Sequence, residues 1–341
     1  MSKPNDQALL DVKGLRMFFP IQRGFLRRTI GHVRAVDDVT FFIRKGEMLS
    51  LVGESGCGKT TTARCIMRAY TPSAGQILFQ TKTGAVVDIA ALPKPSLRPL
   101  RPEIQMIFQD PVSSLNPRMT VHDIIAEGLI VNAMGSGSER TDKVAESMRL
   151  VGLRPEYMRR FPHAFSGGER QRIGIARALV LNPSLIVADE PVSALDVSVQ
   201  AQILNLLLEL QQKLGLTMLF VAHDLSVVKH ISHRVAVMYV GRIVETAETA
   251  ALFAQPLHPY TEALLSSVPK ADPLLESKRI PLEGEVADPA RPPSGCYFHP
   301  RCQYVTDICR SQTPALDEVQ PGHFASCHRS RELKLAGVRR V

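Results

Sequence analysis

A glycine-rich stretch directly after an apolar run has the residue types and the spacing of a phosphate-binding loop. Gly53, Gly58, Lys59 and Thr60 match the pattern G-x-x-x-x-G-K-[ST], and the apolar segment Met48–Val52 precedes them. In this pattern the glycines let several backbone N–H groups point at phosphate oxygens, and the helix that follows adds the positive end of its dipole. The lysine would reach the terminal phosphates, and the threonine hydroxyl would be one ligand of a bound Mg²⁺.

The stretch therefore predicts a strand, a loop that binds a nucleoside triphosphate, and a helix. A chance glycine turn before a helix is the alternative, and the apolar segment argues against it because a strand is required at that place. The motif by itself is shared by many classes of nucleotide-binding protein. The residues predicted to contact the nucleotide are Gly53, Glu54, Ser55, Gly56, Cys57, Gly58, Lys59, Thr60 and Thr61.

Two adjacent carboxylates, Asp189 and Glu190, follow the apolar residues 185–188 of the segment that begins at Ser184, and they precede a proline. Strand ends in open α/β sheets face the ligand crevice, so Asp189 is placed to hold Mg²⁺ through water and Glu190 to polarise an attacking water. The alternation of side chains along a strand points the two carboxylates in different directions, which suits two roles. An acidic turn without function is the alternative.

Two further polar residues follow predicted strands. Gln109 comes after the apolar run 103–108, and its amide is suited to contact Mg²⁺ and the water near the terminal phosphate. His223 follows the apolar segment Thr217–Ala222. Taken alone, each would be interpreted as an ordinary surface or structural residue. The functional interpretation depends on the neighbouring motifs.

The segment Ser166, Gly167, Gly168 and Glu169 stands before the predicted helix 173–180. Serine is a good helix N-cap, and paired glycines allow a phosphate to approach the exposed N–H groups. For these residues alone an ordinary capped helix is the favoured interpretation.

The apolar stretches and helical periodicity in the rest of the chain predict an α/β domain. Short apolar stretches at 9–12, 17–19 and 39–43, separated by a basic insertion at 22–34, indicate an antiparallel edge sheet. Residues 121–151 have helical periodicity with a break at 135–138, which indicates a mostly helical insertion. Further strands are expected at 76–80, 86–89, 235–239 and 242–245, and a helix at Val197–Leu214.

Composition limits the class of protein. The chain has 341 residues, 45% of them hydrophobic, and a net charge of +8. It contains no run of eighteen apolar residues and no secretory signal pattern, so we expect a cytosolic protein or one attached to a membrane through partners. The positive charge is scattered apart from residues 23–34 and 329–340, and it favours a solvated surface over a nucleic-acid or membrane site.

Together and in this order, the motifs resemble the ATP-binding subunits of ABC transporters. The resemblance implies a P-loop ABC ATPase domain over residues 1–265, with a RecA-like mixed sheet, an antiparallel edge sheet and a helical insertion at about 112–180. It implies ATP and Mg²⁺ as ligands, Glu190 as catalytic base, His223 as the switch residue, and the loop from Ser193 to Asp196 as part of the site. Glu169 departs from the most frequent signature, which has glutamine there, but the three residues before it are intact.

The resemblance also implies partners. Two such ATPases close head to tail on ATP, and the signature of one, Ser166–Glu169, contacts the phosphates held by the other. A flat side chain in the basic insertion often covers the adenine in this family, and Phe25, Ile30 and His32 are the candidates.

Within that family the chain is similar to the oligopeptide and dipeptide importer group. The similarity lies in the basic insertion at 23–34, the run from Gln109 to Pro117, and the tail from 258 to 302. It implies a second ATPase chain, two integral membrane permease subunits and an extracytoplasmic substrate-binding protein, with this subunit at the cytoplasmic face of the membrane. Nickel importers have closely related ATPases and are the alternative. A soluble ABC ATPase acting on DNA or ribosomes is a further alternative. The sequence contains neither the tandem ATPase halves nor the long coiled-coil insertion that would support it.

A small cysteine-rich C-terminal domain is expected over 266–341. The proline-rich residues 281–293 lead to four cysteines, Cys296, Cys302, Cys309 and Cys327. The cytosolic setting disfavours disulfides, and the spacing differs from that of zinc ribbons. Four thiolates can hold an iron–sulfur cluster, and some members of the peptide importer group carry a [4Fe–4S] cluster at such a pattern. Zinc and unligated thiols remain the alternatives.

Overall fold

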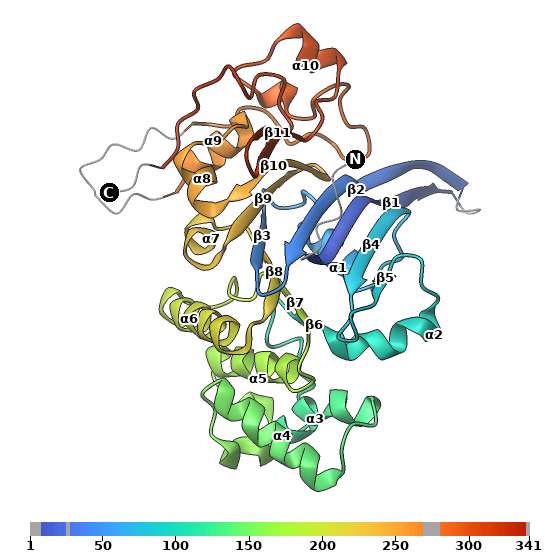
Figure 1. Cartoon of the computed structure of the whole chain (residues 1–341), viewed down its shortest axis with the longest axis vertical. Helices are drawn as coiled ribbons and strands as arrows, with labels where there is room; N and C mark the ends of the chain where they lie inside the picture. The colour runs from blue at the N-terminus through green and yellow to red at the C-terminus, as the bar shows by residue number, and fades with distance from the viewer. Residues whose placement is uncertain (1–7, 25–27, 269–279, 339–341) are drawn as a thin grey trace. The chain divides into compact units, whose positions relative to one another are not determined.

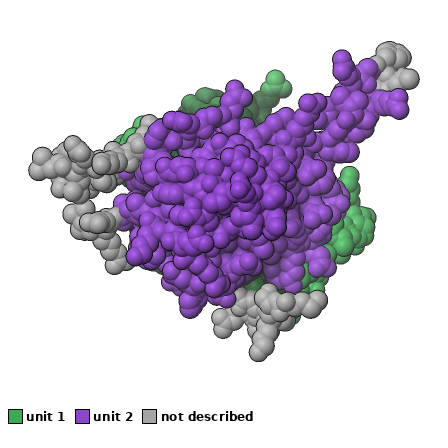
Figure 2. All heavy atoms as spheres, turned by 90° about the horizontal axis from the view of Figure 1, so that it is seen from above, with its two compact units in different colours: residues 1–10, 43–47, 78–221 green, residues 11–42, 48–77, 222–341 purple. Residues whose placement is uncertain are grey.

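The computed structural model describes residues 8–24, 28–268 and 280–338, which fall into two compact units. Figure 1 shows their helices and strands, and Figure 2 distinguishes the units by colour. The first unit comprises residues 1–10, 43–47 and 78–221, and the second comprises residues 11–42, 48–77 and 222–341. The phosphate loop therefore shares a unit with the C-terminal tail. The domain boundary expected near residue 265 stays a prediction.

Three parallel strands form the sheet of the first unit. Their order is β6 (Ile104–Ile107), β7 (Leu185–Asp189) and β8 (Thr217–Ala222). Every residue of β7 and β8 is buried, which matches the continuous apolar runs of the sequence. The carboxyl ends of the three strands consequently lie at one edge of this sheet, with Asp189 at the end of β7.

Helices make up most of the rest of the first unit, and α3, α4 and α5 pack against one another in the lower part of Figure 1. The break predicted at 135–138 is confirmed, because α3 ends at Val131 and Ser136 caps α4. The helical elements of this unit are α2 (Lys94–Leu97), α3 (Val121–Val131), α4 (Gly137–Leu150), α5 (Gly167–Leu179), α6 (Val197–Leu214), and the 3₁₀ turns Arg98–Glu103, Pro155–Arg159 and Pro162–Ala164.

The strand before the phosphate loop lies in a sheet that the C-terminal tail completes. β3 (Met48–Val52) pairs in parallel with β9 (Arg234–Tyr239), which pairs antiparallel with β10 (Arg242–Glu248). The tail then adds β12 (His323–Ala325) to β10, and β11 (Asp317–Gln320) to β12. The helical elements of this unit are α1 (Lys59–Ile66), α7 (Leu225–Ile231), α8 (Thr249–Ala254), α9 (Pro259–Ser266), α10 (Asp307–Ser311) and the 3₁₀ turn His299–Arg301.

The edge sheet has the order β2-β1-β4-β5. Its strands are β1 (Ala8–Arg23), β2 (Arg28–Arg44), β4 (Ala74–Gln80) and β5 (Val86–Asp88). The predicted edge sheet is present, and its first two strands are longer than the apolar stretches: β1 extends to Arg23 and β2 begins at Arg28, with 16 and 17 residues. A ladder of backbone hydrogen bonds does not require apolar side chains, so exposed basic residues continue the strands.

A buried carboxylate ties the tail to β10. Glu245 is fully buried, and its carboxylate accepts hydrogen bonds from the Leu257 N–H (2.7 Å), the His258 N–H (2.9 Å) and His323 Nε2 (2.7 Å). Such a buried charge is tolerated because its oxygens are satisfied. Burial lowers the pKa of His258 to about 3, so its neutral Nδ1 accepts the Tyr260 N–H at 3.0 Å. Tail and strand are thus joined both by pairing and by side chains.

No helix in the described ranges is long and apolar enough to cross a membrane.

Candidate active site

The phosphate loop curls because glycine stands where no side chain would fit. A Cβ on Gly53 would lie 2.1 Å from the Met238 carbonyl oxygen, and one on Gly58 would lie 2.2 Å from the Ala35 carbonyl oxygen. Both glycines also have positive φ, 153° and 107°, which side chains disfavour. The loop therefore packs backbone against backbone on β9 and β2, and its shape is fixed by that contact.

Lys59 lies over the inside of the same loop. Its side chain is buried, and Nζ donates hydrogen bonds to the carbonyl oxygens of Gly53 (2.8 Å) and Glu54 (3.0 Å). The ammonium group is thus held at the loop in which the phosphates are expected. Thr60 lies in the first turn of α1, and that turn contains no acidic residue. The positive end of the helix dipole is consequently left for an anion.

Glu54, the second residue of the loop, has partners in the tail. Its N–H donates to the hydroxyl of Tyr260 on α9 (2.9 Å). Its carboxylate accepts two hydrogen bonds from Arg301, with Nη1–Oε2 at 2.8 Å and Nη2–Oε1 at 3.2 Å. No local pattern in the sequence indicates these contacts, because the residues are 206 and 247 positions apart.

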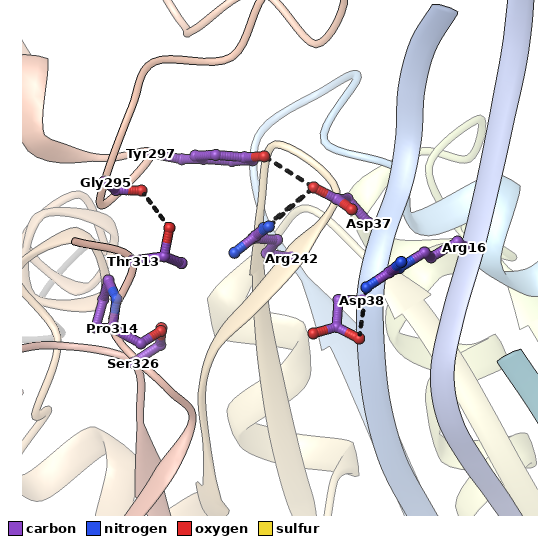
Figure 3. A network of polar contacts seen from close by, with 9 residues as sticks. All are labelled: Arg16, Asp37, Asp38, Arg242, Gly295, Tyr297, Thr313, Pro314 and Ser326. Carbon is purple, nitrogen blue, oxygen red and sulfur yellow. Dashed lines mark hydrogen bonds and ion pairs between the residues drawn. The ribbon is translucent and has the colours of Figure 1, made fainter. Parts of the chain in front are cut away.

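A second tail contact reaches Asp37 on β2 (Figure 3). The hydroxyl of Tyr297 donates to Asp37 Oδ2 (2.8 Å), and Arg242 donates to the same oxygen from Nη2 (3.0 Å) and Nε (3.3 Å). Burial would raise the pKa of Asp37, but the hydrogen bonds from Tyr297 and Arg242 outweigh it and hold the pKa below its ordinary value. Asp37 therefore stays a carboxylate that joins β2, β10 and the tail.

The three polar residues predicted at strand ends of the first unit lie together. Asp189 ends β7 and is buried, and the amide of Gln109 donates from Nε2 to Glu190 Oε2 at 3.1 Å. Glu190 has a φ of 46°, a strained conformation for a residue with a side chain. Hydrogen bonds hold it there, since its N–H donates to the Val221 carbonyl oxygen and its own carbonyl oxygen accepts from the Ser193 hydroxyl. The two carboxylates thus have different environments, and their separate roles stay a prediction.

The signature residues form the start of α5. Ser166 accepts the Glu169 N–H, and Glu169 Oε2 accepts the Ser166 N–H at 2.9 Å, so the two residues form a capping box. The helix consequently begins at Gly167, six residues before the predicted start at 173. These backbone and hydroxyl hydrogen bonds from Ser166 also lower the pKa of Glu169. A glutamate and a glutamine both supply the oxygen that this cap needs, so the departure from the common signature keeps the local structure.

The loop after the carboxylates ends in a helix cap. Asp196 Oδ1 accepts hydrogen bonds from the Val199 N–H (2.9 Å) and the Ser198 hydroxyl (2.8 Å), which starts α6. His223 follows β8 and is exposed. Ile30 and His32 are both exposed on β2, and Phe25 lies outside the described residues, so the adenine contact stays a prediction.

All four tail cysteines line one cavity in the second unit. Gly295 brings the segments together, because its φ of 70° and the absence of a Cβ allow it to approach the Cys309 carbonyl oxygen closely. Burial raises the pKa of Cys296 to about 11 and that of Cys327 to about 12, so these thiols are protonated at neutral pH. Within the described residues no group of three or more histidine, cysteine, aspartate or glutamate side chains is arranged to hold a metal ion. The described part of the chain therefore shows neither the expected iron–sulfur site nor a separate cysteine-rich domain.

Comparison with known proteins agrees with the motifs. The family model described as ABC transporter matches residues 36–193, and the model described as oligopeptide/dipeptide transporter, C-terminal region, matches residues 244–309. The oligopeptide transport ATP-binding protein AppF of Bacillus subtilis is 51% identical over 96% of this chain and 99% of its own length. A probable peptide ABC transporter ATP-binding protein of Sinorhizobium fredii is 52% identical over 94% of this chain and 90% of its own.

Solved structures show the same core. A bacterial ABC transporter cassette, solved as a dimer, has a TM-score of 0.61 at 27% identity and covers 70% of this chain and 98% of that chain. A post-hydrolysis dimer of an ATP-binding cassette bound to ADP and phosphate gives the same values. With the phosphate loop, the carboxylate pair and the capped signature in place, this chain belongs to the ABC transporter family as an ATP-binding subunit of its oligopeptide/dipeptide group.

Proposed function

We propose that this chain binds and hydrolyses ATP to drive the transport of peptides through a membrane complex. The main support for this proposal is the phosphate loop. Lys59 is buried against the loop, and the positive end of the α1 dipole, with no acidic residue in its first turn, lies at the loop. The chain's likeness to peptide transport ATP-binding proteins over almost all of its length supports peptides as the cargo class.

Each residue of the proposed site has a defined task. The loop amides and Lys59 hold the phosphates, while the Thr60 hydroxyl, Gln109 and Asp189 are the residues that would hold Mg²⁺. Bound Mg²⁺ would supply charge neutralisation at the phosphates. Glu190 accepts the proton of the attacking water, Gln109 fixes Glu190 through the bond at 3.1 Å, and His223 is the switch residue.

We further propose a second ATPase subunit, similar but not identical, as the direct partner. The capped start of α5 would meet the phosphates that the partner holds, with Ser166, Gly167, Gly168 and Glu169 as the contacting residues. Two membrane permease subunits and an extracytoplasmic binding protein complete the proposed importer, which places this subunit at the cytoplasmic face of the membrane.

The assembly prediction is that tagged chain, expressed with the genes beside its own, purifies from mild detergent with two integral membrane proteins and a second ATPase. A transport subunit needs these partners to couple hydrolysis to movement. Tagged Gly167→Arg serves as the control for the ATPase contact, because Gly167 is exposed and a Cβ there would make only an ordinary contact, 3.6 Å from Leu195 Cδ2. Recovery of nucleic acid or ribosomes without membrane proteins would contradict the proposal.

Lys59→Ala should weaken ATP binding by about 10²-fold or more, because the phosphates lose their buried cationic partner. Isothermal titration of the purified chain with Mg²⁺ and ATP measures this loss. Lys82→Ala, which removes an exposed lysine of the first unit, is the control. If Lys59→Ala binds ATP like the unmodified chain, this loop is not the nucleotide site.

Glu190→Gln should retain ATP binding and lose turnover by about 10²-fold or more, because glutamine keeps the shape of the side chain but accepts no proton. Steady-state phosphate release from the assembled complex, with the partner site disabled, measures the change. The neighbouring Asp189→Asn should instead weaken the dependence of binding on Mg²⁺. Near-normal hydrolysis by Glu190→Gln would show that another group is the base.

We also propose that Cys296, Cys302, Cys309 and Cys327 hold an iron–sulfur cluster in anaerobic protein. The support is the shared cavity and the donor set of four thiols, and the raised pKa values mean that binding would release protons.

Anaerobically purified protein should then be brown and contain iron and sulfide in near-equal amounts, whereas zinc would give a colourless protein with one metal ion. Cys327→Ser should lower the iron content severalfold, and Cys65→Ala, at a buried position on α1, should leave it unchanged. Colourless anaerobic protein without iron would refute the cluster.

A further inference from the structure

The phosphate loop contains a negative charge of its own. Glu54 lies between Gly53 and Ser55, and its side chain is 27% exposed. A loop that binds a triphosphate must attract several negative charges, and a free carboxylate beside them would repel them. Something must therefore neutralise Glu54 for the loop to bind its ligand well.

Arg301 is placed to do so. Both terminal nitrogens of its guanidinium contact the Glu54 carboxylate, at 2.8 and 3.2 Å, and the arginine side chain is only 5% exposed. A two-point arginine–carboxylate pair of this kind is strong and fixes orientation as well as charge. An arginine guanidinium stays protonated in proteins, so this pair sets a full positive charge against the Glu54 carboxylate.

Aromatic packing fixes where Arg301 lies. It ends the 3₁₀ turn His299–Arg301, whose preceding residue Phe298 packs on Tyr239 (5.3 Å between ring centroids) and on Tyr260 (5.4 Å). Its guanidinium carbon lies 6.0 Å from the ring centroid of Tyr239. The arginine is consequently held against a buried aromatic cluster to which β9, α9 and the tail contribute.

Three separate contacts converge on Glu54. Its N–H is bound by Tyr260, its carbonyl oxygen by Lys59, and its carboxylate by Arg301. When Lys59 turns toward phosphate, the other two contacts still hold the residue. Both come from segments C-terminal to β10, so the tail fixes the first part of the loop.

We propose that Arg301 is a positioning residue of the ATP site, which acts through Glu54 by cancelling its charge and holding the phosphate loop in its binding shape. The inference rests on the assignment of residues 53–61 as the nucleotide loop. It gives the C-terminal tail a direct part in nucleotide binding, separate from any metal in the cysteine cavity.

The test is a binding series on the full chain with adenosine, AMP, ADP and ATP in the presence of Mg²⁺. Arg301→Gln should weaken ATP binding about tenfold, ADP binding less, and adenosine binding by less than about twofold, because the repulsion from Glu54 grows with ligand charge. A structural defect would lower all four affinities alike. Arg291→Gln, which removes an exposed arginine of the same unit, is the control for net charge.

The second arm removes the charge that Arg301 cancels. Glu54→Gln is the reference for this arm, and Arg301→Gln added to it should lower ATP affinity by less than about threefold, against about tenfold when Glu54 is present. Rescue in this double variant also shows that the tail still folds. Equal losses for adenosine and ATP, or a double variant as weak as Arg301→Gln alone, would overturn the proposal.

Lys59→Ala in the same series separates the two assignments. Loss of ATP binding in Lys59→Ala, with normal binding in Arg301→Gln, refutes only the role of Arg301. Normal ATP binding in both variants refutes the loop assignment, and the role of Arg301 with it.

Discussion

Backbone packs directly on backbone around the phosphate loop, and the rest of the site depends on that contact. Gly53 meets the Met238 carbonyl oxygen, and Gly58 and Gly241 meet the backbone around Ala35, at distances that leave no room for a Cβ. The curl of the loop is therefore set by β9 and β2 and not by the loop's own side chains. Because the carbonyl oxygens turn inward, Lys59 has acceptors there before any ligand arrives. Residues that stabilise β2 and β9 consequently stabilise the site as well.

The tail stabilises those same strands. It adds two strands to the edge of β10 and is tied there by the buried Glu245 and its three donors. Tyr297 then contacts Asp37 of β2, while Arg301 contacts Glu54 in the loop itself. These contacts are buried or nearly so, where a charged hydrogen bond is strong and an unpaired partner is costly. The tail is therefore part of the same packed unit as the phosphate loop, whether or not the cavity lined by its four cysteines holds a metal.

The features that could be predicted from the sequence are those whose physics is local. The phosphate loop, the carboxylates after β7 and the N-cap Ser166 each depend on residues only a few positions apart, so the local pattern is enough to predict them. The predicted helix begins six residues too late, at 173, because paired glycines usually weaken a helix, whereas the capping box of Ser166 and Glu169 starts α5 at Gly167. The bond between Arg301 and Glu54 spans 247 positions, and nothing in either neighbourhood distinguishes that arginine from the others. Long-range pairs of this kind follow from the completed fold, which the local pattern does not determine.

The two signature glycines, Gly167 and Gly168, differ in whether packing within this chain requires glycine at that position. Gly168 is buried, and a Cβ there would lie 2.5 Å from Val199 Cγ1, so the start of α6 requires glycine at that position. Gly167 is exposed, and a Cβ would lie 3.6 Å from Leu195 Cδ2, an ordinary contact. Alanine also has a higher helix propensity than glycine, so the helix itself does not require glycine there. The packing of this chain therefore does not explain Gly167, whereas close approach of a second molecule to the bare helix start would.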